Sequence, residues 1–324
     1  MPAPLGIDIG FGMIKWVDAQ GRHGILPAAW VPHAAGAETW GLGAVDQPMY
    51  LDGRAFVAGE PAASRPGAHR PFADGRLADP EAMPLLAAAL WATGAEGDVV
   101  LGSGTPLSAF AQERETARAA LEGRTLHLGQ NGQARTVRLT RLALRPQGVG
   151  AALHLALTGR WPNGTGYGLV VDVGTRTTDV LCLRLHDLAP LVELSFSIEA
   201  GVSTAAEQLA SMIERATGHL PPSDIATAAL TRPVTWHAQV VGGPEAAVEM
   251  LDALAALIRT EIARRMGADF GRVEAAALVG GGSVLLGSRL AGVAQGQIAL
   301  YPEEALYTNA LGFQHAAARL AGAS

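Results

Sequence analysis

Two stretches of the chain follow the same order of apolar and polar residues. Residues 167–173 form an apolar, β-branched run that predicts a buried strand, and a polar turn separates it from a second apolar run at 180–185. Residues 5–16 repeat this order near the N-terminus. Each stretch therefore predicts a β-hairpin whose first strand carries an aspartate near its end.

The two aspartates, Asp8 and Asp172, stand 164 positions apart, which is about half of the 324-residue chain. Either hairpin alone is explained by the ordinary use of Asp and Gly in turns. Two copies at half-chain spacing instead favour a duplicated fold whose halves face each other across a cleft. We therefore expect an α/β protein with two domains around one cleft.

The rest of the pattern fills in these two domains. Strands are predicted at 98–102, in a hairpin over 124–144, at 191–198, within 234–241 and at 275–279. Helices are predicted at 81–93 with Asp79 as N-cap, at 110–121, from the 144–150 turn to about 158, at 205–216, at 244–266 and at the C-terminus. The expected domains are 1–158 with an inserted subdomain at about 32–93, 159–311 with an inserted helical subdomain at about 205–272, and a C-terminal helix, 312–324, that returns to the first domain.

Composition excludes several classes of protein. Hydrophobic residues make up 49%, which predicts a packed globule, and the net charge of −6 without a basic cluster argues against direct nucleic-acid binding. No run approaches the roughly 18 apolar residues of a membrane span, and no signal peptide or paired histidines are evident. The single cysteine, Cys182, lies in a predicted strand and suits a core thiol of a cytoplasmic protein.

The polar residues of the central hairpin suit a nucleotide and a metal ion. Gly174 lets backbone N–H groups turn toward one point, and the hydroxyls of Thr175 and Thr177 add donors for a phosphate. Asp172 would repel that phosphate unless a divalent cation lay between them. A triple glycine, 280–282, follows a predicted strand and precedes a helix, which allows close approach of a flat ligand.

Other nucleotide-binding motifs are absent from the sequence. A P-loop requires GxxxxGK[ST], but the only lysine, Lys15, follows Ile14. A dinucleotide fingerprint requires a third glycine at the position that Lys15 occupies after Gly10 and Gly12. The protein-kinase motifs are missing as well. A site made from two Asp-Gly hairpins and a glycine-rich turn remains.

The motifs, in this order, resemble those of the actin, Hsp70 and sugar-kinase superfamily. Residues 8–12 with Lys15 resemble its first phosphate motif, 172–179 its second, and 278–283 its adenosine motif. Within the superfamily, residues 104–107, 145–148 and 308–313 are most similar to the bacterial and archaeal actin-like ParM group. Arg176 departs from the pattern, because a small residue is usual at this position of the second phosphate hairpin.

The resemblance implies an actin-like (ribonuclease H-like) fold that binds ATP or ADP with Mg²⁺. Asp8 and Asp172 would hold the metal through waters, and Gln147 would orient the attacking water, so that these three residues form the expected catalytic set. The expected nucleotide contacts, besides the two aspartates, come from Gly10, Phe11, Gly12, Lys15, Gly174, Thr175, Arg176, Thr177, Gly201, Gly280, Gly281, Gly282 and Ser283. From the residues alone, a solvated polar role for Gln147 near a helix terminus is equally compatible with the pattern.

The resemblance also implies a cellular role. We expect a Mg²⁺-dependent ATPase that polymerises head to tail into filaments for plasmid segregation, with an adaptor protein bound to DNA as partner and no membrane contact. One alternative is a small-molecule kinase of the same fold, in which Asp179 is the candidate catalytic carboxylate. Another is a chaperone or reactivase ATPase, although Hsp70-type chaperones carry a long substrate-binding extension that we do not expect here.

Overall fold

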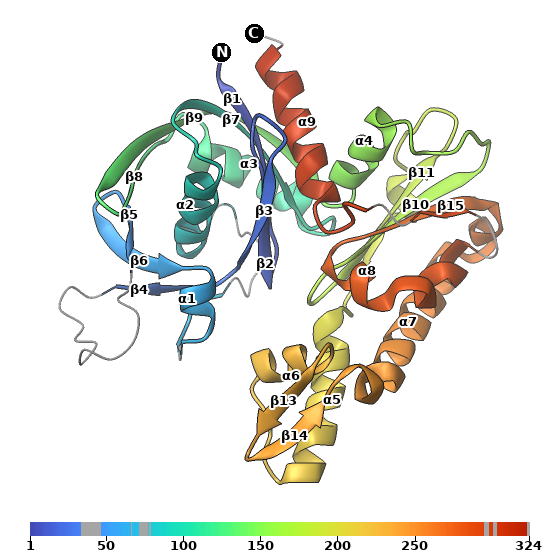
Figure 1. Ribbon diagram of the computed structural model, residues 1–324. Coiled ribbons are helices and arrows are strands. Elements are labelled where there is room, and N and C mark those ends of the chain that lie inside the picture. Colours follow the sequence, from blue (N-terminus) through green and yellow to red (C-terminus); the bar gives the residue numbers. More distant parts are fainter. Residues whose placement is uncertain are drawn as a thin grey trace. The chain divides into compact units, whose positions relative to one another are not determined.

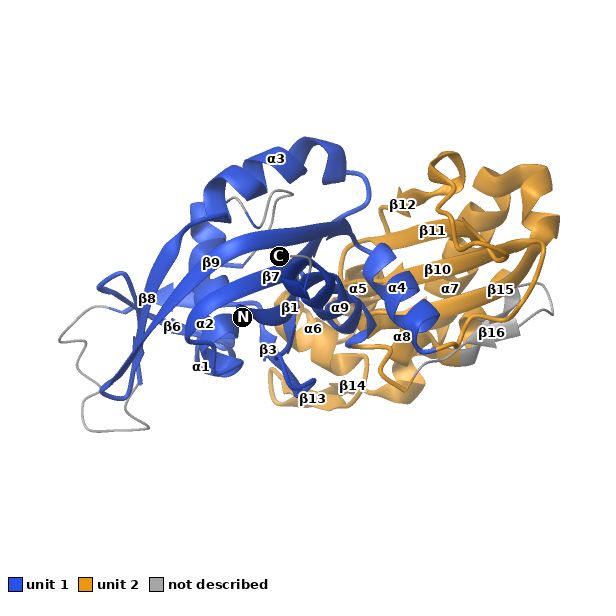
Figure 2. Cartoon of the chain, turned by 90° about the horizontal axis from the view of Figure 1, so that it is seen from above, with its two compact units in different colours: residues 1–158, 307–324 blue, residues 159–306 orange. Residues whose placement is uncertain are grey.

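The computed structural model divides into two compact units (Figure 2). Unit 1 contains residues 1–158 and 307–324, and unit 2 contains residues 159–306. All residues are described except 34–46, 66, 71–76, 78, 295–297, 301–302 and 323–324. We expected the return to the first domain at residue 312, but it begins at Tyr307, because helix α9 (Thr308–Gly322) packs on the unit 1 sheet from its first turn.

Within the described residues, nine strands form the sheet of unit 1. Their order is β3-β2-β1-β7-β9-β8-β5-β6-β4. The strands are β1 (Ala3–Ile9), β2 (Met13–Val17), β3 (His23–Pro27), β4 (Trp30–Pro32), β5 (Met49–Leu51), β6 (Arg54–Ala58), β7 (Gly97–Thr105), β8 (Thr125–Gln130) and β9 (Gln133–Pro146). Strands β5 and β6 come from the stretch that we expected to be an inserted subdomain; β6 pairs with β4, and through β8 these strands extend the same sheet.

The sheet of unit 2 has the same strand arrangement as β3-β2-β1-β7-β9, the first five positions in the sheet of unit 1. In its described part it runs β12 (Phe196–Ile198), β11 (Thr178–Arg184), β10 (Tyr167–Val173), β15 (Val273–Val279) and β16 (Ile298–Leu300). Strand β10 pairs antiparallel with β11 and parallel with β15, as β1 pairs antiparallel with β2 and parallel with β7. The shared order and directions confirm the duplication that the two hairpins predicted.

Helices cover these sheets (Figure 1). Unit 1 contains α1 (Glu60–Ala63), η1 (Pro80–Ala82), α2 (Met83–Ala92), α3 (Phe110–Leu121), α4 (Val149–Leu157) and α9. Unit 2 contains η2 (Val192–Leu194), α5 (Val202–Thr217), α6 (Ser223–Ala229), α7 (Pro244–Met266), η3 (Gly267–Arg272), α8 (Gly281–Leu286) and η4 (Gly287–Ala294). The bounds of α3 and α7 are those predicted from the sequence.

Two predicted strands differ from the structure. Residues 191–198 form η2 followed by the short β12, because the Ser195 hydroxyl donates to the Leu191 carbonyl at 2.7 Å and accepts from the Cys182 N–H at 3.0 Å. Residues 234–241 lie in a hairpin of β13 (Pro233–Trp236) and β14 (Gln239–Gly242). The chain reverses there at His237 and Ala238, which both adopt positive φ.

Helix α9 packs very closely against its neighbours β1, β7 and α4 (Figure 1). A Cβ added at Gly312 would overlap the carbonyl of Gly150 on α4, and one at Gly102 on β7 would overlap the carbonyl of Phe313. These glycines let two backbones touch, so that even a methyl group has no room. The packing of α9 therefore depends on the absence of side chains at the contact.

Replacing Gly312 with alanine should therefore destabilise unit 1 by about 3 kcal/mol or more, because neither backbone can move without disturbing the sheet. The measurement is the midpoint of chemical denaturation. Gly322→Ala in the same helix is the matched control, because nothing lies within 4 Å of a Cβ there. Equal stability of the two variants would contradict the close packing of α9.

Two histidines join α4 to α9. His154 is 6% exposed, and its Nδ1 lies 3.2 Å from Nε2 of His315, with the two rings stacked at a centroid distance of 5.4 Å. Burial lowers the pKa of His315 below its ordinary value of 6.5. The folded protein therefore binds fewer protons at this site than the unfolded chain as the pH falls through about 6.5.

We accordingly expect the melting temperature to fall as the pH is lowered from about 7 through the range just below 6.5, where the unfolded chain takes up the proton first. His315→Gln should reduce this slope, because glutamine does not titrate. Melting curves at a series of pH values test the expectation, with His33→Gln as a control at a histidine outside the α4–α9 contact. A slope unchanged by His315→Gln, or reduced equally by both variants, would contradict the assignment.

The single cysteine behaves as predicted. Cys182 on β11 is fully buried, and burial is the main cause that raises the pKa of its thiol to about 12. The thiol is therefore protonated at neutral pH and is not a nucleophile.

Among the helices that the structure describes, none has the length and apolar character to cross a membrane.

Candidate functional site

The first hairpin places a lysine opposite the first aspartate. Asp8 on β1 faces Lys15 on β2 in the strand register, and Lys15 Nζ lies 3.5 Å from Asp8 Oδ2. Asp8 is only 5% exposed. The turn between the strands is closed by the Gly10 N–H, which donates to the Met13 carbonyl at 3.0 Å. The buried Asp8 carboxylate thus lies beside a tight turn and pairs with the Lys15 ammonium group.

Gln147 contacts the same carboxylate from the end of β9. Its Nε2 donates to Asp8 Oδ1 at 3.1 Å, and the side chain is 9% exposed. Its backbone N–H donates to the Thr105 carbonyl at 2.8 Å, at the end of the neighbouring strand β7. The Gln147 side chain is therefore buried against Asp8 and is not solvated.

Asn309 at the start of α9 fixes the turn that follows Gln147. Its Oδ1 accepts from the N–H groups of Gly148 and Ala151, both at 3.1 Å, and so caps the N-terminus of α4. Gly148 has a φ of 82°, which a side chain would strain. Sequence reasoning did not assign a role to Asn309, although residues 308–313 were part of the resemblance; its partners lie more than 150 positions away.

The second hairpin repeats the turn of the first. The Gly174 N–H donates to the Thr177 carbonyl at 2.9 Å, which matches the Gly10–Met13 bond in both atoms and spacing. The cross-strand pair differs, because Asp172 on β10 faces Asp179 on β11, where the first hairpin has Lys15. Asp172 and Asp179 are 9% and 3% exposed. Like charges placed opposite each other repel, so a cation near this pair would be stabilising.

The N–H groups of Gly10 and Gly174 bond within their own turns, which reduces the number of backbone donors expected for a phosphate. We expected the backbone N–H groups of residues 10–12 and 174–177 to cradle phosphates. Gly10 and Gly174 instead use theirs to close the turns. N–H donors for a phosphate would therefore come from residues that follow these glycines, such as the half-buried Thr175 and Thr177.

The N-terminus of α5 is docked on the second turn. The N–H groups of Val202 and Ser203 donate to the carbonyls of Gly174 and Thr175 at 3.1 and 2.7 Å. A Cβ at Gly201 would lie 2.6 Å from the Thr175 carbonyl oxygen, so only glycine allows this approach. The carbonyls of the turn thus point toward α5, and the turn is held in one conformation.

The triple glycine reaches the same end of the unit 2 sheet. Gly280 has a φ of 83°, and a Cβ on it would overlap the Asp172 carboxylate, while one on Gly282 would overlap the Val173 side chain. The Ser283 hydroxyl donates to the Gly280 carbonyl at 2.7 Å and steadies the turn into α8. Unit 2 therefore brings together Asp172, Gly174, Thr175, Gly201 and the triple glycine at the carboxyl ends of β10 and β15.

Each unit holds one of the two aspartates, and among the described residues neither belongs to a metal site built from protein ligands alone. Among the residues that the structure describes, no group of three or more His, Cys, Asp or Glu side chains is gathered as such a site requires. Magnesium usually keeps several waters and binds one or two carboxylates together with phosphate oxygens. Asp8, held by Lys15 and Gln147 in unit 1, and Asp172, held against Gly280 in unit 2, are each a carboxylate of the kind that such an ion binds.

Two family models match the chain. The N-terminal domain of actin-like proteins matches residues 6–150, and the C-terminal part of the MreB-like archaeal actin homologue matches residues 170–292. The chain is 41% identical to the archaeal actin homolog of Thermoplasma acidophilum over 324 residues, which covers 97% of this chain and 98% of that protein. The two models and this relative span both hairpins and the triple glycine.

Solved structures agree with this similarity. Ta0583, an archaeal actin homolog, superposes with a TM-score of 0.89 at 40% identity, over 97% of this chain and 99% of that one. Its complex with ADP gives a TM-score of 0.87 at 41% identity, with the same coverage. A ParM from Clostridium botulinum, solved as a 15-stranded filament, gives 0.84 at 16% identity over 98% and 99% of the chains, which supports the fold alone. The fold is thus actin-like, as the motifs predicted.

Proposed function

Because the chain belongs to the archaeal actin homologues of the actin-like protein family, we propose that it binds and hydrolyses ATP with Mg²⁺. The observation that supports this most directly is the hydrogen bond from Gln147 to Asp8. It joins the residue assigned to the attacking water with a residue assigned to the metal. The ADP complex of the similar archaeal actin homolog supports the choice of nucleotide.

The two hairpins carry the proposed phosphate contacts. Backbone N–H groups that follow Gly10 and Gly174, with the hydroxyls of Thr175 and Thr177, would donate to the phosphates, and Lys15 would add positive charge. When bound, Mg²⁺ neutralises the phosphate charge that develops during phosphoryl transfer. Asp8 and Asp172 are assigned to its water ligands, and the residues 280–283 to the nucleoside.

Gln147 has the chemistry to orient water. A neutral amide donates and accepts hydrogen bonds, and its bond to Asp8 leaves the amide oxygen to accept from a water. A glutamine cannot remove a proton efficiently, so the intrinsic rate should be slow. The Thr105 carbonyl and the Asn309 cap hold the backbone on both sides of Gln147, and a small displacement of either would move the amide.

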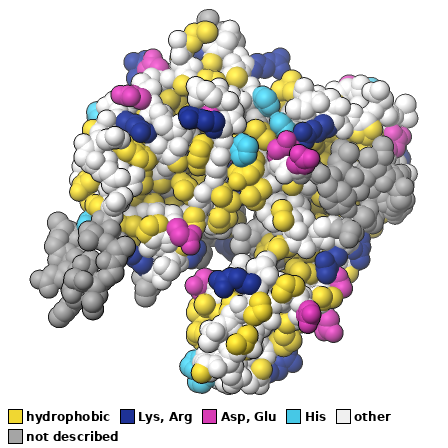
Figure 3. All heavy atoms as spheres, viewed as in Figure 1, with side chains coloured by type: hydrophobic (Ala, Val, Ile, Leu, Met, Phe, Trp, Pro, Cys, Tyr) yellow, Lys and Arg dark blue, Asp and Glu magenta, His cyan; other side chains and the backbone are white. Residues whose placement is uncertain are grey.

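We further propose that the protein assembles head to tail into filaments in the cytoplasm. The support is the shared fold of a ParM that was solved as a filament. A head-to-tail interface that does not close into a ring generates a filament. We propose in addition that the filaments move DNA, which an adaptor protein links to them. Figure 3 shows basic and acidic side chains interspersed on one face, and such a face does not favour direct binding of DNA.

Sedimentation and light scattering across a protein concentration series test assembly, with Mg-ATP, Mg-ADP or no nucleotide. We expect polymer only above a critical concentration and most readily with Mg-ATP. Retained ATPase activity without assembly in any condition would contradict the filament proposal and leave the ATPase proposal standing. Absence of both activities, in a protein that is folded by circular dichroism, would contradict both.

A small-molecule kinase is the second candidate function, and its catalytic carboxylate would be Asp179. The structure buries Asp179 to 3% exposure, and the Ser197 hydroxyl donates to its carboxylate. A base for a substrate hydroxyl must lie within reach of that substrate. The burial of Asp179 therefore favours the ATPase.

A further inference from the structure

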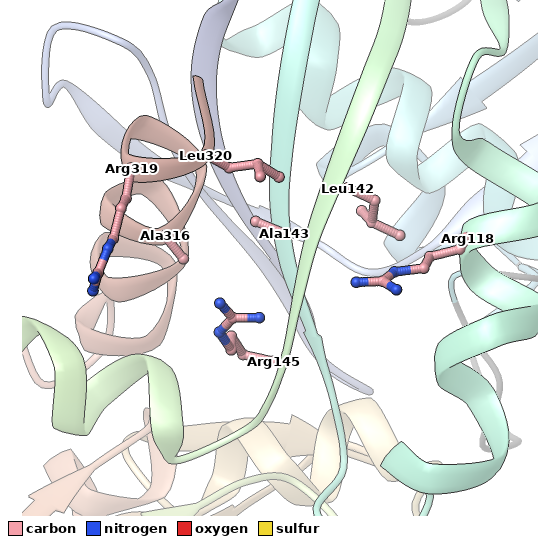
Figure 4. A pocket seen from close by; sticks show the side chains of 7 residues that line it. All are labelled: Arg118, Leu142, Ala143, Arg145, Ala316, Arg319 and Leu320. Atoms are coloured by element: carbon pink, nitrogen blue, oxygen red, sulfur yellow. The ribbon is translucent and has the colours of Figure 1, made fainter. Parts of the chain in front are cut away.

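A small cavity in unit 1 is lined by three arginines (Figure 4). Its volume is about 290 Å³. The arginines are Arg118 from α3, Arg145 from β9 and Arg319 from α9, and the other lining residues are Leu142, Ala143, Ala316 and Leu320. We call this set the arginine pocket. None of its residues belongs to the nucleotide site assigned above.

The positive charge of the arginine pocket is poorly neutralised. Arg118 has one carboxylate within reach, that of Glu115 at 3.9 Å, and its buried Nε makes no hydrogen bond with the described residues. In the described part of the chain no carboxylate lies within ion-pair distance of Arg145 or Arg319. Arg145 Nη1 instead donates to the Leu144 carbonyl at 2.9 Å. Three guanidinium groups therefore line one cavity with a single distant counter-charge.

A second acidic side chain beside the lining is already engaged. Glu122, just after α3, accepts the N–H of Leu142 at 2.8 Å through its Oε1. Figure 4 shows Arg118 reaching from α3 toward β9, and the Arg145 guanidinium between β9 and α9. Arg319 lies along α9. The three cations thus come from three separate elements and line the same cavity, where one anion could contact more than one of them.

The size of the cavity decides which kind of anion fits. Ligand pockets usually measure about 300 to 1,000 Å³, so this cavity is at the lower end and suits a molecule of a few carbon atoms. Guanidinium groups pair with carboxylate and phosphate oxygens through charge-assisted hydrogen bonds, often two at a time. The apolar side chains between the arginines would contact the carbon skeleton that joins such groups.

We propose that the arginine pocket binds a small organic anion that carries two or more carboxylate or phosphate groups. Several guanidinium groups around one cavity favour a multivalent anion over a monovalent one. The site is independent of the proposed nucleotide site, because binding is expected without nucleotide and without metal. The failure of either proposal therefore leaves the other intact.

Isothermal titration calorimetry of the nucleotide-free protein with citrate, succinate and acetate tests the proposal at constant ionic strength and without Mg²⁺. We expect saturable binding at one site per chain, with affinity that rises from acetate through succinate to citrate. The double variant Arg145→Gln, Arg319→Gln should bind citrate at least about tenfold more weakly, because two charge-assisted pairs are lost. Both side chains are exposed, so the variant should fold.

The matched control is the double variant Arg54→Gln, Arg232→Gln, which removes the same charge from two exposed arginines outside the pocket. It should bind citrate as the unaltered protein does. No saturable binding of citrate by the unaltered protein, or equal weakening in both double variants, would overturn the assignment. A second titration with a three-carbon bisphosphate, which carries no carboxylate, separates phosphate from carboxylate ligands when its affinity is compared with that of citrate.

Discussion

Asp172→Asn should lower the rate of Mg²⁺-dependent ATP hydrolysis at least about 100-fold, because the metal loses one of its two assigned carboxylates. The variant should nevertheless be at least as stable as the unaltered protein. Asp172 and Asp179 face each other across β10 and β11, and removal of one charge relieves their repulsion. Phosphate release at saturating Mg-ATP measures the first effect, and thermal melting measures the second.

The combination of lost activity and retained stability separates a metal role from a structural one. Asp187→Asn is the matched control, because Asp187 lies in the exposed turn after β11 of the same hairpin. It should hydrolyse ATP at the normal rate. Normal Mg²⁺-dependent turnover by Asp172→Asn would contradict the assignment of Asp172 to the metal. Loss of both activity and fold would indicate a structural role instead.

Gln147→Ala should reduce the hydrolysis rate about 100- to 1,000-fold, the usual cost of losing one group that orients the reacting atoms. Affinity for ATP should change little, because no phosphate or nucleoside contact is assigned to the Gln147 side chain. Single-turnover hydrolysis and equilibrium binding of a fluorescent ATP analogue measure the two quantities. If the protein forms filaments, this variant should assemble with ATP and disassemble slowly.

The control for this variant is Gln133→Ala, the same substitution at an exposed position of β9, the strand that precedes Gln147. Its turnover should be unaffected. Unchanged turnover in Gln147→Ala would remove Gln147 from the mechanism. Weakened ATP binding with an unchanged chemical step would reassign it from orienting water to holding the nucleotide.

The local sequence was informative wherever a residue's neighbours in the chain decide its structure. The helices α3 and α7 were predicted with their observed bounds, because apolar periodicity and Pro244 at the first position of α7 act within one or two turns. The two hairpins were predicted from β-branched runs and one glycine each. Two expected strands were correct only in part, since the Ser195 hydrogen bonds and the positive φ at His237 and Ala238 leave no trace in the alternation of apolar and polar residues.

The candidate site likewise has some features that neighbouring residues determine and others that depend on distant parts of the chain. The sequence alone determined which residue types form each phosphate turn, because Asp8, Gly10, Asp172 and Gly174 lie within a few positions of their hairpins, and the repeated order revealed the duplication. Only the tertiary structure decided which residues meet across long distances in the chain.

Three long-range contacts show this most clearly. Gln147 bonds to Asp8, 139 positions away, and Asn309 caps the turn at Gly148 from 161 positions away. Gly280 lies against Asp172 because β10 and β15 are parallel neighbours. Hydrophobic periodicity reports which face of an element is buried, and it carries no information on the partner. These contacts follow from sheet order and helix packing, which the whole chain sets together.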